Sequence, residues 1–118
     1  MDDEPNIRTI LGQVLSDLGH TPLFARNGPE AIQLLREEYS AKRKVAAVFL
    51  DLTIAGGMGG VETVSEIRKH GFTLPVFAMS GYNDSPVMAQ PKDFGFDGSL
   101  GKPMRLRDLG DFLAKHLS

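Results

Sequence analysis

The stretch Val45-Ala46-Ala47-Val48-Phe49-Leu50-Asp51 decides the fold, because six consecutive apolar residues end abruptly on a carboxylate. A strand that is covered by helices on both faces has this pattern, whereas a half-exposed strand alternates apolar and polar residues. Asp51 therefore stands at the carboxyl end of a predicted central strand. In open parallel sheets this edge is where ligands bind, so we expect a functional site there.

Helix and strand patterns alternate on both sides of this stretch. The apolar residues from Ile7 to Leu18 recur every three or four positions, which predicts a helix over about residues 5–18. We predict further helices over about 29–39, from 61 to near 71, briefly and irregularly after Ser85, and through 106–116. Strands are predicted at 21–25, at an edge because of Pro22, and at 45–50, 74–79 and 98–101. This order predicts one α/β domain over residues 1–118, with a doubly wound parallel sheet.

Composition excludes several classes of function. Thirteen Lys and Arg against 15 Asp and Glu give a net charge of −2, so no basic field exists to hold nucleic acid or anionic lipid. The absence of cysteine excludes disulfides, thiol catalysis and thiolate zinc sites, and suits a reducing cytoplasm. The apolar run 45–50 is far shorter than the ~20 residues of a membrane span. We therefore expect a cytoplasmic chain with no nucleic-acid partner and no membrane contact.

Polar residues suited to one chemistry follow the predicted strands or precede the first helix. They are Asp2, Asp3 and Glu4, then Asp51, Ser80 and Lys102. Clustered carboxylates without a thiol or imidazole form an all-oxygen site, which suits Mg²⁺. A carboxylate that attacks a phosphoryl group needs positive charge to screen the repulsion, and Mg²⁺ with Lys102 can supply it. The Ser80 hydroxyl can donate a hydrogen bond to a phosphoryl oxygen.

Taken together, these residues resemble the response regulator receiver domains of two-component signalling. The matching motifs, in order, are Asp2-Asp3-Glu4-Pro5, Asp51-Leu52, Met58-Gly59-Gly60, Ser80-Gly81 and Lys102-Pro103. They cover essentially the whole chain. The stretches 50–54 and 80–84 more narrowly resemble the C-terminal receiver of hybrid sensor histidine kinases.

The resemblance implies a flavodoxin-like fold with strand order 2-1-3-4-5 and a role for each site residue. Asp51 would accept a phosphoryl group from a histidine of a sensor histidine kinase or phosphotransfer domain. Asp3 would bind Mg²⁺ directly, Asp2 mainly through water, and the main-chain carbonyl of Thr53 would be a third ligand, with Asp51 completing the metal set. Lys102 would pair with the phosphoryl group, and Ser80 would move toward it after transfer.

Two features depart from the family pattern. Only Met1 stands where the first strand should end, so the domain is expected to be truncated at its N-terminus and to lack the central strand 1. The uncovered sheet edges this leaves predict self-association and weakened Mg²⁺ binding. Ser99 also occupies the position that holds a switch aromatic ring in many receivers.

Two alternatives stay open beside the phosphoacceptor reading. One is a degenerate receiver that is not phosphorylated and serves as a protein-interaction or dimerisation module. The other is a small phosphatase of the haloacid dehalogenase-like type, which Thr53 disfavours because that chemistry needs a second acid there. Whether the chain counts as an enzyme is equally open: it would mainly promote its own Mg²⁺-dependent phosphotransfer, alone or as part of a hybrid histidine kinase.

Overall fold

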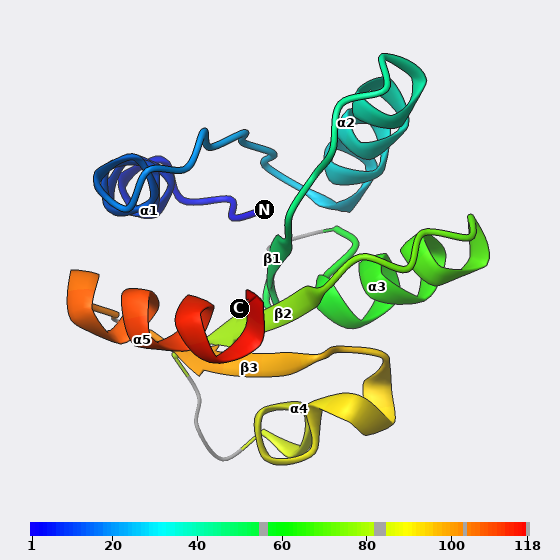
Figure 1. The fold of residues 1–118 in the computed structure, drawn as a ribbon. Helices are drawn as coiled ribbons and strands as arrows, with labels where there is room; N and C mark the ends of the chain where they lie inside the picture. Colours follow the sequence, from blue (N-terminus) through cyan, green and yellow to red (C-terminus); the bar gives the residue numbers. More distant parts are fainter. Residues whose placement is uncertain (55–56, 82–84, 103, 118) are drawn as a thin grey trace.

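The computed structural model describes residues 1–54, 57–81, 85–102 and 104–117, as five helices, a 3₁₀ turn and three strands (Figure 1). The helices are α1 (Pro5–Asp17), α2 (Gly28–Ser40), α3 (Gly60–Lys69), α4 (Pro86–Ala89) and α5 (Leu106–Leu117), with the 3₁₀ turn η1 (Pro91–Phe94) after α4. The strands are β1 (Val48–Asp51), β2 (Val76–Ser80) and β3 (Gly98–Gly101). The motif residues 82–84 and Pro103 lie outside the described residues.

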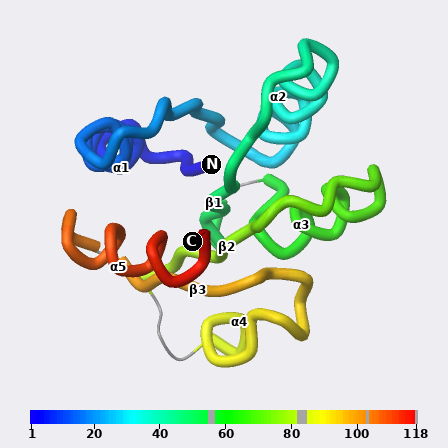
Figure 2. Tube along the Cα trace, in the orientation of Figure 1, coloured from blue at the N-terminus to red at the C-terminus, as the bar shows by residue number. Residues whose placement is uncertain are grey.

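The three strands form one parallel sheet in the order β1-β2-β3. Helices α1 and α5 lie on one side of the sheet and α2, α3 and α4 on the other, which gives the three layers of a doubly wound fold (Figure 1). The amino terminus lies beside β1, between α1 and α2 (Figure 2). The expected layered α/β architecture is therefore present.

The core lies at β2 and along both of its faces. All five residues of β2 are buried, including Phe77 and Met79 with no exposed surface. On the α5 side, the Phe77 ring packs edge-on against Phe112 at 4.8 Å between centroids and lies 5.0 Å from His116. The strand predicted to be central, the apolar run that ends at Asp51, is instead the edge strand β1, with only Leu50 and Asp51 buried, and the central strand is β2.

Local signals account for the ends of several elements. Asn27 caps α2, because its side chain accepts a hydrogen bond from the Glu30 N–H at 3.0 Å. Ser85 caps α4 in the same way, but Pro91 stops this helix after one turn and starts η1. The fourth helix is therefore short and irregular, as the sequence predicts. Ser99 ties this region to the sheet, since its Oγ donates to the Met88 carbonyl at 2.8 Å.

A half-buried arginine lies at the opposite end of the sheet. Arg68 of α3 donates to the carbonyls of Phe72 at 3.1 Å and Leu74 at 2.8 Å, and pairs with Asp97 at 2.9 Å. The Asp97 carboxylate also accepts the Val76 N–H at 2.9 Å. These contacts fix the turns into β2 and β3, so both strands enter the sheet in register.

The strand predicted at residues 21–25 is wrong, because this segment is extended but forms no strand. A strand needs a neighbour along its length, and here Ala25 alone is bonded, through its carbonyl, to the Asp2 N–H at 3.0 Å. Pro22 removes one donor in addition. β1 is likewise shorter than predicted and begins at Val48 instead of Val45. Within the described residues, no helix is long and apolar enough to cross a membrane.

Candidate functional site

The carboxyl ends of all three strands meet at one edge of the sheet. β1 ends on Asp51, β2 ends on Ser80, and Lys102 follows directly after β3. The register holds these residues together, because the Lys102 N–H donates to the Ser80 carbonyl at 2.9 Å. The fold therefore brings three predicted site residues to one edge, although they are far apart in the sequence.

The Lys102 ammonium lies between two carboxylates. Its Nζ is 2.5 Å from Asp2 Oδ2 and 3.2 Å from Asp51 Oδ2. Both carboxylates are buried, with side chains 2% and 7% exposed, and the Lys102 side chain is 15% exposed. Two negative groups removed from water thus share one positive group, so these three side chains carry a net negative charge that a bound cation would offset.

The main chain of the first two residues positions the acidic loop. The Asp51 N–H donates to the Met1 carbonyl at 3.0 Å, and the Glu4 N–H donates to Asp2 Oδ1 at 3.0 Å. Arg8 Nη1 donates to the Asp2 carbonyl at 2.8 Å. Sequence reasoning missed Arg8; its place one turn into the helix that follows the acidic residues is the signal that could have found it.

Burial and charge act in opposite directions on these groups. Burial raises the pKa of Asp51 above its ordinary value, while the Thr53 N–H at 3.1 Å and the Lys102 charge partly offset it. Burial alone would lower the pKa of Lys102, but hydrogen bonds and attraction from Asp2 and Asp51 outweigh it and raise that pKa. Lys102 therefore stays charged, and Asp51 is a more basic carboxylate than one in water.

The acidic residues can supply oxygen ligands to a cation. Carboxylate oxygens of Asp2, Asp3 and Glu4 lie within 4.8 Å of one another. Asp2 and Asp51 approach the same Lys102 ammonium, and Thr53 follows Asp51 as an exposed residue. An all-oxygen donor set fits Mg²⁺, so the predicted metal residues are chemically suited to that ion.

Ser80 is buried at the end of β2, at 3% exposure, and this residue is not without a partner. The structure thus brings Asp2, Asp51 and Lys102 into contact and places Ser80 on the neighbouring strand end. The roles of these residues remain predictions from the resemblance.

Comparison with known proteins agrees with this geometry. The family model of the response regulator receiver domain matches residues 1–114. An NtrX-like response regulator of Rickettsia bellii is 35% identical over 87% of this chain, which spans about a fifth (21%) of that relative. Sporulation initiation phosphotransferase F of Bacillus subtilis is 26% identical over 99% of this chain and 90% of its own length.

Solved structures lead to the same family. The response regulator TrrA of Thermotoga maritima, solved with Mg²⁺ and BeF, is 27% identical and superposes with a TM-score of 0.78 over 97% of this chain and 92% of its own. Hybrid signal transduction histidine kinase A of Dictyostelium discoideum and the sensor histidine kinase RcsC of Salmonella typhi are also among the relatives. With the layered parallel sheet and the acidic strand-end site in agreement, this chain belongs to the response regulator receiver domain family of two-component signalling.

Proposed function

We propose that Asp51 accepts a phosphoryl group from a histidine of a sensor histidine kinase or a phosphotransfer domain, with Mg²⁺ bound at Asp2, Asp3, Asp51 and the Thr53 carbonyl. The observation that carries this proposal is the Lys102 ammonium, 3.2 Å from Oδ2 of the buried Asp51 carboxylate. An ammonium at that distance from the acceptor is also within reach of a phosphoryl oxygen on it.

The transfer makes one bond and breaks one. An Asp51 carboxylate oxygen attacks phosphorus, and the P–O bond forms as the P–N bond of the phosphohistidine breaks. The electron pair of the P–N bond stays on the ring, and the histidine leaves as neutral imidazole because its other ring nitrogen carries a proton. The raised pKa of Asp51 favours the attack, because a more basic carboxylate is a stronger nucleophile once deprotonated. Mg²⁺, when bound, supplies the charge that screens the carboxylates from the incoming phosphate.

Lys102 and Ser80 would act on the transferred group. The Lys102 ammonium would move part of its interaction from the Asp51 carboxylate to one phosphoryl oxygen. The Ser80 hydroxyl would donate a hydrogen bond to a second phosphoryl oxygen. The TrrA relative was solved with Mg²⁺ and BeF, which supports Mg²⁺ as the ion of this site. The cysteine-free composition supports a cytoplasmic location.

Intact-mass spectrometry after incubation with acetyl phosphate and MgCl₂ tests the proposal. We expect one phosphoryl adduct on the native chain and none on Asp51→Asn. Asp93→Asn is the matched control, because Asp93 is an exposed aspartate of η1, which precedes the amino end of β3 whereas the site lies at its carboxyl end, and it should keep the adduct. No adduct on the native chain would support the degenerate receiver instead.

Self-association is the second part of the proposal. Among the described residues β1 is an edge strand: β2 pairs with it on one side, and on the other side Met1 bonds to Phe49 and Asp51. We propose that copies of the chain associate across this uncovered edge at high concentration. Light scattering should then give a mass above 12.9 kDa that rises with concentration, and a constant 12.9 kDa would contradict it.

A further inference from the structure

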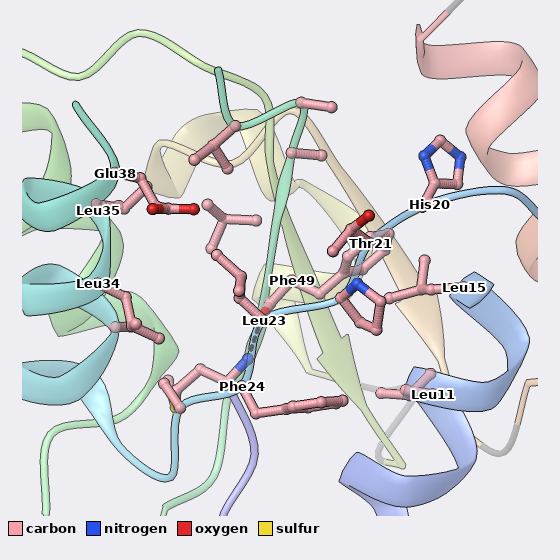
Figure 3. Close-up of a pocket in the computed structure, with 18 of the residues that line it drawn as sticks. Leu11, Leu15, His20, Thr21, Leu23, Phe24, Leu34, Leu35, Glu38 and Phe49 are labelled. Carbon is pink, nitrogen blue, oxygen red and sulfur yellow. Dashed lines mark hydrogen bonds between the residues drawn. The ribbon is translucent and has the colours of Figure 1, made fainter. Parts of the chain in front are cut away.

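Arg8 lies on the face of α1 that carries its inward-pointing leucines. Leu11 and Leu15 follow Arg8 at spacings of three and four residues, so the three side chains share one face of the helix. Figure 3 shows Leu11 and Leu15 pointing from α1 toward a cavity that Arg8 and Asp2 also line. Arg8 is half-buried there, at the end of α1 that follows the acidic residues.

The place of Arg8 in the helix does not stabilise the helix itself. Arg8 is the fourth residue of α1, and the amino end of a helix carries partial positive charge that disfavours a nearby cation. No acidic residue stands in the first turn of α1 to offset this repulsion. A half-buried cation that its own helix disfavours points to a role outside the helix.

The Arg8 guanidinium holds the peptide group between the predicted metal ligands Asp2 and Asp3. Its Nη1 donates to the Asp2 carbonyl at 2.8 Å. The remaining polar groups of Asp2 are also bonded, to the Ala25 carbonyl, the Glu4 N–H and the Lys102 ammonium. Every polar group of Asp2 therefore has a partner, and Arg8 supplies the one that fixes the carbonyl.

The position of Asp3 depends on this carbonyl. The Asp2 carbonyl and the Asp3 N–H belong to one planar peptide group, so a hydrogen bond that fixes the carbonyl also restrains the Cα of Asp3. Carboxylate oxygens of Asp2, Asp3 and Glu4 lie within 4.8 Å of one another. Repulsion between these like charges favours spreading the loop, and the bond from Arg8 opposes that movement of the main chain.

We propose that Arg8 is a positioning residue for Mg²⁺ binding: its hydrogen bond to the Asp2 carbonyl holds Asp2 and Asp3 in the arrangement that binds the ion. The inference rests on the Mg²⁺ site of the proposed function and goes beyond it, because it assigns Arg8 a role without contact to the ion or the phosphoryl group. Removing a residue that holds a metal ligand in place typically weakens metal binding by about 10–100-fold.

The charge of Arg8 and its hydrogen bond predict opposite effects on the affinity for Mg²⁺. A guanidinium near the acidic loop repels the ion, so loss of the charge alone would tighten Mg²⁺ binding. Loss of the hydrogen bond would release the main chain of the loop and weaken Mg²⁺ binding. The sign of the change therefore shows which of the two contributions is larger.

Calorimetric titration of the full chain with MgCl₂ tests the proposal on three variants. Arg8→Met removes the charge and the donor, and should raise the Kd for Mg²⁺ about tenfold. Arg8→Gln, with a shorter and uncharged side chain, should show the same loss. Arg8→Lys keeps a charged donor for this single hydrogen bond, and its Kd should stay within about threefold of the native value.

Arg36→Met is the matched control, because it removes the same charge at a distance from the site. Arg36 is exposed on α2 and contacts His70 at 3.3 Å, at the carboxyl end of α3. The opposite end of α3, at Gly60, is the one that lies against the Asp51 main chain. Arg36→Met should therefore change the Kd for Mg²⁺ less than about twofold.

Two further readouts separate positioning from a general loss of structure. The unfolding midpoint in EDTA reports the stability of each variant without metal. If Arg8 were only structural, its loss would lower this midpoint and leave the Mg²⁺ affinity of the folded chain unchanged. At high KCl concentration the effect of the guanidinium charge is screened, and the tenfold difference between Arg8→Met and the native chain should persist.

Unchanged or tighter Mg²⁺ binding in Arg8→Met and Arg8→Gln would overturn the proposal. So would an Arg8→Lys variant that loses as much affinity as Arg8→Met, or a native chain that does not bind Mg²⁺ at millimolar concentration. The acetyl phosphate adduct is read separately. An adduct on the native chain with unchanged affinity in Arg8→Met would overturn this inference alone, and a tenfold loss of affinity without any adduct would overturn the phosphoacceptor role alone.

Discussion

Replacing Lys102 by methionine should destabilise the folded chain by about 3 kcal/mol, the lower end of the cost of breaking a buried ion pair. Methionine keeps most of the length of the side chain but removes the ammonium that lies 2.5 Å from Asp2 and 3.2 Å from Asp51. Two buried carboxylates then lose their shared counter-charge. The cost lies at the lower end of the range for buried ion pairs because the Lys102 side chain is still 15% exposed.

The expected readout is a fall in the unfolding midpoint of roughly 10 °C at neutral pH in EDTA. Lys69→Met is the matched control, since the Lys69–Glu66 pair is an exposed contact at 3.4 Å and should change stability by at most about 0.5 kcal/mol. Millimolar MgCl₂ should restore part of the loss in Lys102→Met, because the ion would replace the missing positive charge.

The sign of the pH dependence follows from Asp51. Its pKa in the folded chain lies above the ordinary value, mainly because of burial, so the folded state binds this proton more tightly than the unfolded chain. Stability from this group is therefore gained as the pH falls through the folded pKa. Removing Lys102 raises the pKa of Asp51 further. The difference in the free energy of unfolding between Lys102→Met and the native chain should therefore narrow on acidification. A gap that stays constant from neutral to mildly acidic pH would refute the reasoning.

Three further outcomes test other parts of the structure. Burial lowers the pKa of the Met1 amino group from 8.0 to about 6. The contribution of this group to stability is therefore present above pH 8 and is lost as the pH falls through 6. Urea unfolding should give a free energy of unfolding about 3 kcal/mol lower below pH 6 than above pH 8. Arg68→Met removes the carbonyl contacts and the Asp97 pair at the entry of the sheet, and should cost about 2 kcal/mol in the same assay. Gly28→Ala would place a Cβ 2.4 Å from Thr63 Oγ1 and should cost about 1–3 kcal/mol, seen as a lower midpoint; an unchanged midpoint would show that the contact yields freely.

The parts of the fold that rest on local pattern were predictable. The helix stripe from Ile7 to Leu18 gave α1 within one residue, because periodicity and the flanking Pro5 and Gly19 act locally. The expected strands before Asp51 and Ser80 are also present as β1 and β2. Charge and topology together were enough to place Asp51, Ser80 and Lys102 at one edge.

The parts that rest on distant partners were not predictable. Residues 21–25 have strand composition, but a strand forms only beside another chain segment, and Asp2 alone bonds there. The same cause shortens β1, because residues 45–47 pair with no strand among the described residues. The Lys102–Asp2 contact joins residues 100 positions apart, so no sequence window could have shown that it is the shortest ion pair of the site.

The hydrogen bond from Ser99 to Met88 bears on how a signal could leave the site. The Ser99 hydroxyl of β3 donates to the backbone of α4, so a shift of β3 toward or away from the site acts directly on α4 through this bond. With a small serine at this position, no large side chain can flip between an inward and an outward pose. A signal that follows this route would therefore consist of a displacement of β3 and α4. A docking partner would have to recognise the changed position of these two elements instead of a newly exposed aromatic ring.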